Sequence, residues 1–173
     1  MIEINNSCLL CIDIQKAYSD IQNFDLFKNN ITNLLKYSRK NNLLITHIFE
    51  IDSKDKSKWL NFWEELKGKK RILDKGLPFS FSKPLSSENV IYKNGYDAFF
   101  ETNLLKWLKK NKVKTLYICG LLTSICVLNT IFSAFNNGFR IILIENCCSD
   151  RTQVSHNNTI KNYKNNLFKT ISF

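Results

Sequence analysis

The 173-residue sequence lacks the features of several protein classes. No apolar run approaches the roughly 20 residues that a membrane-spanning helix requires, so we expect a soluble protein with no membrane partner. It shows no signal peptide, no Pro- or Ser-rich linker, no low-complexity tail and no internal repeat. A chain of this length fits one domain, and we therefore expect a single domain over residues 1–173.

Metal and redox motifs are also missing. The two histidines, His47 and His156, are far apart, and a lone histidine in a strand is more often packed or hydrogen-bonded than a ligand. Cys8 and Cys11 have Cys-x-x-Cys spacing, but in a strand they would face opposite sides of the sheet, which suits neither a redox turn nor a zinc site. The remaining cysteines lie mostly in apolar runs, so we expect a reducing, cytoplasmic compartment.

The formal net charge of +10 raises the question of a nucleic-acid partner, because basic patches gain affinity by releasing counterions from phosphate. The lysines, however, are scattered among asparagines over every segment. This pattern is typical of a solvated surface, and we expect no nucleic-acid partner.

Apolar and amphipathic segments alternate along the chain. Short apolar runs typical of buried strands occur at 7–14, 43–49, 89–93, 114–120, 139–146 and 167–173. Helical spacing of apolar residues occurs at 25–42, 59–66, 99–112, 124–137 and 153–166. This alternation predicts a mostly parallel sheet covered by helices on both faces.

Three residues of reactive type lie at predicted strand ends. Asp13 closes the first strand, Lys93 closes the third, and Cys126 follows the fourth by a short loop and opens a helix. Ligands of open parallel sheets bind outside the carboxyl ends of the strands. A helix N-terminus and a nearby lysine lower the pKa of a thiol, and Asp13 could accept its proton and return it to a leaving amine. This placement predicts a nucleophile, an electrostatic partner and an acid/base.

Each of these residues also has a structural interpretation. The cysteine could be a small buried hydrophobe, the aspartate a turn or cap residue, and the lysine an exposed side chain. Other acids, such as Glu50 and Glu145, close strands as well.

Three blocks of the sequence resemble the isochorismatase-like cysteine hydrolases, a superfamily that includes nicotinamidases and N-carbamoylsarcosine amidohydrolases. The blocks are LLCIDIQ, KNGYDAFFETNLLKWL and LYICGLLTSICVLNTIFSAFNNGFRIILIENCCSD, and the resemblance extends from Ile12 to about Asp150. It implies a three-layer α/β/α, Rossmann-like fold with a six-stranded, mostly parallel sheet of order 3-2-1-4-5-6. It also implies a homo-oligomer, either a dimer or a tetramer.

The resemblance assigns roles to individual residues. Asp13 looks like the acid/base, Lys93 like the group that stabilises the thiolate and the transition state, and Cys126 like the nucleophile. The family's cis peptide bond would be Leu121-Leu122, and the backbone N–H groups of Leu122 and Cys126 would form the oxyanion hole.

The substrate pocket is expected to include residues from several segments: Gln15, Tyr18, Trp59 and Phe99. Trp59 belongs to an aromatic helix that would pack on the domain or a neighbouring subunit, or would form a lid or pocket wall. Where many relatives have Asn-Asp-Phe after the first strand, this chain has Lys16, Ala17 and Tyr18, which alters the edge of the pocket.

The metal motif of the nicotinamidases is a further departure. In those proteins an Asp-Trp-His-type motif follows the second strand, whereas this chain has THIFEIDSKD, with no histidine after the strand. We therefore expect neither a metal nor another cofactor.

These observations together predict a metal-independent cysteine hydrolase of a small amide, carbamoyl or related acyl substrate. One alternative is a vinyl-ether hydrolase of the isochorismate type, which can rely on the aspartate without the cysteine. Another is a catalytically idle scaffold or binding protein with the same fold.

Overall fold

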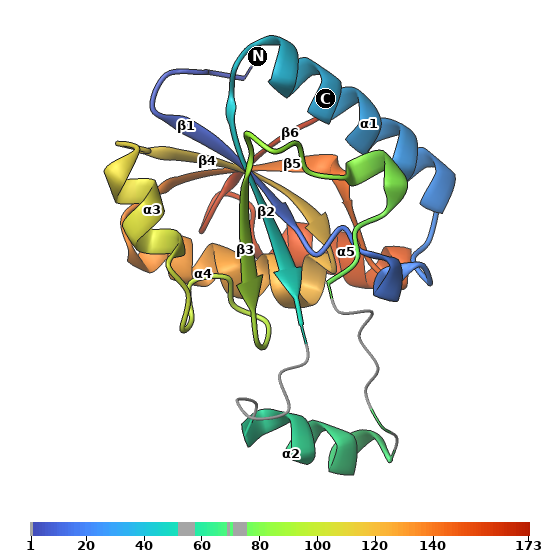
Figure 1. Cartoon of the computed structure of the whole chain (residues 1–173). Coiled ribbons are helices and arrows are strands. Elements are labelled where there is room, and N and C mark those ends of the chain that lie inside the picture. Colours follow the sequence, from blue (N-terminus) through green and yellow to red (C-terminus); the bar gives the residue numbers. More distant parts are fainter. Residues whose placement is uncertain (1, 52–57, 69, 71–75) are drawn as a thin grey trace.

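The computed structural model describes residues 2–51, 58–68, 70 and 76–173, without the side chains of 58–60 (Figure 1). The strands are β1 (Ser7–Ile12), β2 (Leu44–Glu50), β3 (Asn89–Lys93), β4 (Thr115–Leu121), β5 (Arg140–Ser149) and β6 (Lys169–Ile171). The α-helices are α1 (Phe24–Lys40), α2 (Lys58–Lys67), α3 (Leu104–Lys110), α4 (Leu128–Asn136) and α5 (Gln153–Tyr163).

The six strands form one sheet of order β3-β2-β1-β4-β5-β6, and every neighbouring pair is parallel. This confirms the predicted strand order. The chain runs outward from β1 to β3 on one side and then returns to β4 on the other side of β1. The reversal of strand order therefore lies between β1 and β4, where ligand sites of such sheets form.

A separate apolar core lies on each face of the sheet. One face is covered by α1, which buries Phe27, Ile31, Leu34 and Leu35 at the i, i+4, i+7, i+8 spacing of a helix face. The other face is covered by α3, α4 and α5 (Figure 1). Cys11 belongs to the first core and Cys8 to the second, so the two thiols face opposite sides of the sheet, as predicted.

Some element boundaries differ from the sequence prediction. The helix expected over 99–112 forms only over Leu104–Lys110, because Glu101 has a φ of 52°, which is left-handed. The helix expected over 124–137 is divided into a π-helical turn, Thr123–Val127, and α4. The fifth strand extends to Ser149, three residues beyond the expected end at 146.

Helix α2 confirms the helix expected over the aromatic segment and lies beyond the carboxyl end of β2 (Figure 1). Phe62 and Leu66 on this helix are 60% and 65% exposed, so these two side chains do not pack on the domain. The side chain of Trp59 lies outside the described residues.

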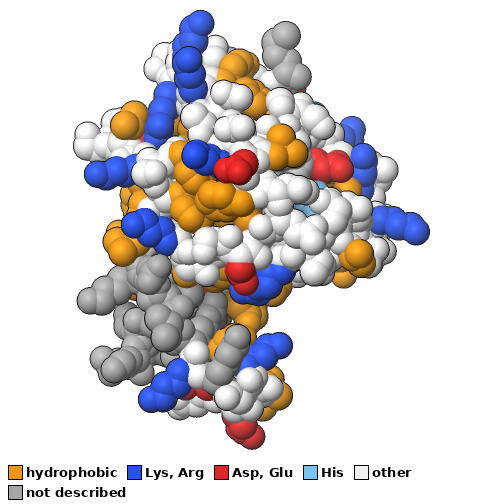
Figure 2. All heavy atoms as spheres, turned by 90° about the vertical axis from the view of Figure 1, so that its right-hand side faces the viewer, with side chains coloured by type: hydrophobic (Ala, Val, Ile, Leu, Met, Phe, Trp, Pro, Cys, Tyr) orange, Lys and Arg blue, Asp and Glu red, His pale blue; other side chains and the backbone are white. Residues whose placement is uncertain are grey.

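The surface is mixed in charge and polarity. Figure 2 shows one face on which Lys and Arg side chains are dispersed, acidic side chains lie between them, and hydrophobic side chains gather near the centre. Within the residues that the structure describes, no helix combines the length and apolar character needed to cross a bilayer.

Candidate active site

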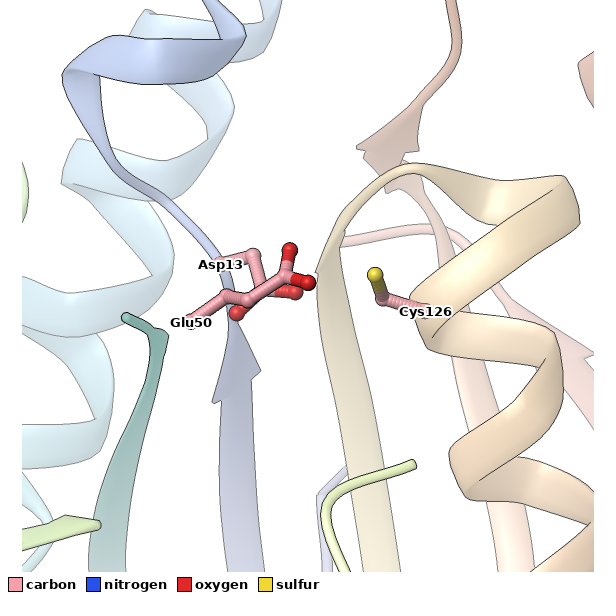
Figure 3. Close-up of side chains that lie close together, drawn as sticks. All are labelled: Asp13, Glu50 and Cys126. Atoms are coloured by element: carbon pink, nitrogen blue, oxygen red, sulfur yellow. The ribbon is translucent and has the colours of Figure 1, made fainter. Parts of the chain in front are cut away.

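The structure brings Asp13, Lys93 and Cys126 together at the carboxyl ends of β1, β3 and β4. The Lys93 Nζ atom lies 2.8 Å from Asp13 Oδ2. A carboxylate oxygen of Asp13, a carboxylate oxygen of Glu50 and the sulfur of Cys126 all lie within 4.8 Å of one another. The three side chains point toward a common space (Figure 3). All four residues are at most 2% exposed, so their charges interact in a medium that water does not screen.

Strand pairing fixes the positions of the charged groups. Glu50 and Lys93 are register partners at the ends of β2 and β3. The Asp13 N–H donates to the Ile48 carbonyl at 2.9 Å, and Asp13 has a left-handed φ of 49°. The Lys93 ammonium also donates to the Gly95 carbonyl at 2.7 Å, which holds the long side chain in one direction.

Close contact between β1 and β4 positions the loop that leads to Cys126. Gly120 has a φ of 127°, and a Cβ atom there would lie 2.0 Å from the Ile12 carbonyl oxygen. Only glycine therefore allows the two strands to approach in this way. The peptide bond Leu121-Leu122 is cis, at the position that the family resemblance implies. The oxyanion-hole role of the Leu122 and Cys126 N–H groups stays a prediction.

Cys126 is the fourth residue of the π-helical turn Thr123–Val127. The Val127 N–H donates to the Leu122 carbonyl at 3.2 Å, five residues back, which widens the turn relative to an α-helix. Helix α4 begins directly afterwards at Leu128, so the thiol lies at the start of a continuous helical segment.

The end of β5, Asp150 directly after it, and α5 hold the first two residues of this turn. The Thr123 hydroxyl donates to the Ser149 carbonyl at 3.0 Å and lies 2.9 Å from His156 Nδ1. The Ser124 N–H donates to Asp150 Oδ2 at 2.8 Å. Thr123, Asp150 and His156 are all buried, so the turn is anchored from inside the protein.

Burial and charge shift the pKa values of the site in opposing directions. Burial raises the pKa of Asp13 to about 6, although the Lys93 ammonium lowers it. Burial lowers the pKa of Lys93, but the charges of Asp13, Cys126 and Glu50 and the hydrogen bond to Asp13 together outweigh this effect, and the pKa lies above its ordinary value. The pair is therefore an ammonium and a carboxylate near neutral pH.

The expected lowering of the Cys126 pKa is wrong for the substrate-free protein. Burial raises the pKa of this thiol well above its ordinary value, and the opposing charge of Lys93 does not compensate. The thiolate is the charged form, and removing it from bulk water by burial is costly. The thiol therefore carries its proton until a base removes it.

Glu50 is a site residue whose role could not be predicted from the sequence. Its carboxylate accepts a hydrogen bond from the Tyr18 hydroxyl, and its backbone N–H and carbonyl both bind the side-chain amide of Gln15, at 2.9 and 3.0 Å. The sequence feature that could have identified Glu50 as a site residue is its position at the end of the second strand; in the structure it pairs with Lys93. Glu145 also lies at a predicted strand end, so this signal alone did not single out Glu50.

The expected pocket residues fall into three groups. Tyr18 and Gln15 are buried and contact Glu50, so they lie at the site. Phe99 is partly buried and packs on Phe139, which directly precedes β5, with ring centroids 6.1 Å apart. Its place in the substrate pocket stays a prediction. Trp59 cannot be placed, because its side chain lies outside the described residues.

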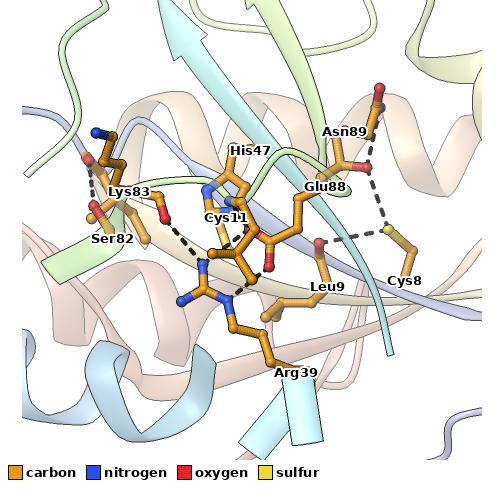
Figure 4. Close-up of polar contacts among 12 residues, drawn as sticks. Cys8, Leu9, Cys11, Arg39, His47, Ser82, Lys83, Glu88 and Asn89 are labelled. Carbon is orange, nitrogen blue, oxygen red and sulfur yellow. Dashed lines mark hydrogen bonds and ion pairs between the residues drawn. The ribbon is translucent and has the colours of Figure 1, made fainter. Parts of the chain in front are cut away.

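Neither histidine contributes an imidazole to the site. His47 Nε2 lies 2.9 Å from Glu88 Oε2, and Arg39 binds the same carboxylate at 2.8 and 3.0 Å (Figure 4). Burial raises the pKa of Glu88, but hydrogen bonds from His47 and Arg39 outweigh it and lower the pKa to about 2. The cluster thus links α1 to β2 and the start of β3, and His156 is bound to Thr123.

The donor set does not fit a catalytic zinc ion. Within the described part of the chain, the group that could ligate a metal is Asp13, Glu50 and Cys126, which offers no neutral nitrogen. The Lys93 ammonium already lies 2.8 Å from Asp13 Oδ2, so a divalent cation there would face a buried positive charge. Asp52, which follows β2, lies outside the described residues.

Comparison with known proteins supplies independent evidence. The sequence model of the isochorismatase domain matches residues 7–172. An uncharacterized isochorismatase family protein of Bacillus subtilis is 32% identical over 100 residues, which cover 57% of this chain and 54% of that protein. An N-carbamoylsarcosine amidase of Arthrobacter is 38% identical over 68 residues, which cover 39% of this chain and 26% of that protein.

Solved structures show the same fold. A structure described as a cysteine hydrolase from Pseudomonas syringae superposes with a TM-score of 0.85 at 16% identity, covering 99% of this chain and 90% of that chain. At this identity the likeness concerns the fold alone. The alignments span 54% and 26% of the lengths of these two curated relatives.

Proposed function

Because this chain belongs to the isochorismatase family, we propose that it is a cysteine hydrolase of a small amide, carbamoyl or related acyl substrate. The observation that carries the proposal is the position of the Cys126 thiol beside the buried Asp13–Lys93 ion pair. The similarity to an N-carbamoylsarcosine amidase supports an amide or carbamoyl substrate.

In the first half of the proposed reaction, Asp13 takes the proton of the Cys126 thiol as the sulfur attacks the substrate carbonyl carbon. The raised pKa of Cys126 requires such a base, and Lys93 stabilises the negative charge that develops. The oxyanion is held by the N–H groups of Leu122 and Cys126. The tetrahedral intermediate then expels the amine, which receives the proton from Asp13, and an acyl or carbamoyl thioester remains.

In the second half, a water molecule attacks the thioester carbonyl carbon. Asp13 takes a proton from the water, the carbon–sulfur bond breaks, and the sulfur recovers its proton from Asp13. The sum is amide plus water giving carboxylic acid plus amine, with the enzyme unchanged. A carbamoyl substrate would follow the same steps and release carbamic acid.

The pH dependence of the rate follows from the role of Asp13. Only its carboxylate form can accept the thiol proton, and its pKa is about 6 because of burial. We expect kcat/KM to rise tenfold per pH unit well below this value and to level off above it. Initial rates between pH 4.5 and 8 would measure this limb. Loss of activity in Asp13→Asn would be consistent with the role of Asp13 as the base. A rate that does not change with pH through pH 6 in the natural protein would contradict that role.

Two other functions explain the site less well. A vinyl-ether hydrolysis of the isochorismate type would need the acid but not the thiol, so it leaves the position of Cys126 unexplained. An idle scaffold would not require a buried ammonium, carboxylate and thiol in one place, an arrangement that is costly to bury. Release of ammonia or amine from a panel of small amides, ureas and carbamates, run beside isochorismate, distinguishes these functions.

We expect turnover to be independent of added or bound metal. The donor set at the site lacks an imidazole, and the proposed steps use only the thiol, the carboxylate, the ammonium and backbone N–H groups. Protein treated with a chelator and dialysed should keep its rate to within about twofold on the substrate found by the panel. Loss of activity on chelation with recovery on adding Zn²⁺ would show that the metal-free assignment is wrong, and Glu50, Asp52 and His47 would then be tested as ligands.

A further inference from the structure

The π-helical turn Thr123–Val127, called the nucleophile turn below, is held in part by a chain of two hydrogen bonds. The donor and the acceptor of each bond can be assigned. The Ser149 carbonyl can only accept, so the single Thr123 hydroxyl proton is donated to it, at 3.0 Å. The Thr123 oxygen must then accept from His156 Nδ1, at 2.9 Å. His156 therefore carries its proton on Nδ1, and the chain runs from His156 through Thr123 to Ser149.

This chain connects α5 to the residue that opens the nucleophile turn. Thr123 is the first residue and Cys126 the fourth of the same π-helical turn. Thr123 is fully buried and His156 is 8% exposed, so water does not readily replace either partner. Asp150 fixes the neighbouring Ser124 N–H at 2.8 Å, so the two residues that start the turn are held by separate side chains.

We propose that His156 is a positioning residue, which holds Cys126 in its reactive direction through the hydrogen bond from its Nδ1 to Thr123. The inference rests on the proposed function, because it assumes that Cys126 is the nucleophile. His156 itself does not touch the reacting atoms. The role of His156 requires one N–H donor at the Nδ1 position. It does not require a positive charge, because burial lowers the pKa of His156 and so favours the neutral ring.

The requirement for a donor at one position gives a matched pair of variants. In His156→Asn the amide nitrogen can occupy nearly the place of Nδ1, whereas in His156→Gln it falls nearer the place of Nε2. His156 also lines a cavity of about 210 Å³ whose other lining residues are mainly polar, so shortening the side chain leaves room that water can fill. His156→Leu removes the donor altogether.

The experiment measures kcat and KM for the four proteins, together with the rate at which iodoacetamide alkylates Cys126, mapped by mass spectrometry. We expect His156→Leu and His156→Gln to lower kcat about 10²-fold with KM within about twofold, because a small misplacement of a reacting group has this effect. Alkylation of Cys126 should slow as well. His156→Asn should stay within about threefold of the natural protein in both measurements.

A second pair tests the same chain from its other side. Thr123→Val keeps the shape of the side chain but removes the hydroxyl, and Thr123→Ser keeps the hydroxyl. The valine variant should resemble His156→Leu, the serine variant should resemble the natural protein, and Thr123→Val combined with His156→Leu should be no slower than either alone. This pair keeps the inference testable if His156→Leu does not fold.

The inference is overturned if His156→Leu and Thr123→Val keep the natural kcat, or if His156→Asn is as slow as His156→Leu at equal thermal stability. The second result would mean that the ring fills space and does not act as a donor. Failure of the proposed function has a different signature, because Cys126→Ala would then retain turnover whatever residue occupies position 156.

Discussion

Cys126→Ala should abolish turnover of any amide or carbamoyl compound that the natural protein hydrolyses. The proposed reaction passes through a bond to this sulfur, and no other thiol can replace it. Removing the nucleophile of an enzyme that acts through a covalent intermediate lowers kcat by about 10⁴- to 10⁶-fold. Product release measured over hours at high enzyme concentration would establish the remaining rate.

A matched control separates loss of the nucleophile from loss of packing. Cys147 is fully buried, but it belongs to the core under α1, whereas Cys126 belongs to the core on the other face of the sheet. Cys147→Ala should keep kcat to within about threefold, although both alanine variants lose about 1 kcal/mol or more of unfolding free energy through the cavity they create. Full activity in Cys126→Ala would reject the cysteine mechanism and favour a reaction that needs only Asp13.

Trapping the proposed thioester on Cys126 gives a second test of the cysteine mechanism. Mixing the natural protein with substrate and quenching in acid should give a mass increase equal to the acyl or carbamoyl group, located on the peptide that contains Cys126. The same treatment of Cys126→Ala should give none. This result would show that the sulfur forms the bond as well as being required.

The sheet could be predicted from the sequence because its signals are local. Apolar runs of strand length alternate with helical spacing, and each reactive residue stands at the end of such a run. Boundaries that depend on single backbone angles could not be predicted in this way. Glu101 has a left-handed φ and delays α3, and the apolar spacing of 124–137 does not distinguish the π-helical turn at Thr123–Val127 from an α-helix.

The site could be predicted in part, since strand ends of a parallel sheet meet at one edge whatever their separation in sequence. This geometry predicted that Asp13, Lys93 and Cys126 would lie close together. The contacts that support them were not predictable, because they join distant segments: Tyr18 to Glu50, and Thr123 to His156. The acidity of Cys126 was predicted with the wrong sign, because the sequence shows its charged neighbours but does not show how completely the thiol is buried.

Lys93 should be the residue on which stability and activity depend together. Lys93→Met keeps a similar side-chain shape but leaves the Asp13 carboxylate, which is fully buried, without its ammonium partner 2.8 Å away. Removing one member of a buried ion pair lowers the free energy of unfolding by about 3 to 5 kcal/mol. We also expect kcat to fall at least about 10³-fold, because the group that stabilises the thiolate and the transition state is lost. Denaturant unfolding and initial rates measure the two effects.

The pH dependence of the loss identifies its cause. The pKa of Asp13 is already raised to about 6 by burial, and removing the Lys93 charge raises it further. A carboxyl group with a folded-state pKa above its unfolded value binds its proton more tightly in the folded protein, so its contribution to stability falls as pH rises through the folded pKa. Lys93→Met should therefore be much less destabilised at pH 5 than at pH 8. The exposed Lys109, changed to Met as a control, should alter stability by less than about 0.5 kcal/mol at either pH.

Combining Lys93→Met with Asp13→Asn distinguishes the two functions of the lysine. The double variant has no buried carboxylate at position 13 to leave unpaired, so most of the lost stability should return and its pH dependence should disappear. Activity should stay absent, since both the base and the cation are missing. If the double variant were as unstable as Lys93→Met alone, the ammonium would stabilise the fold through Gly95 and its own packing, and the ion pair with Asp13 would not be the reason that Lys93 is buried.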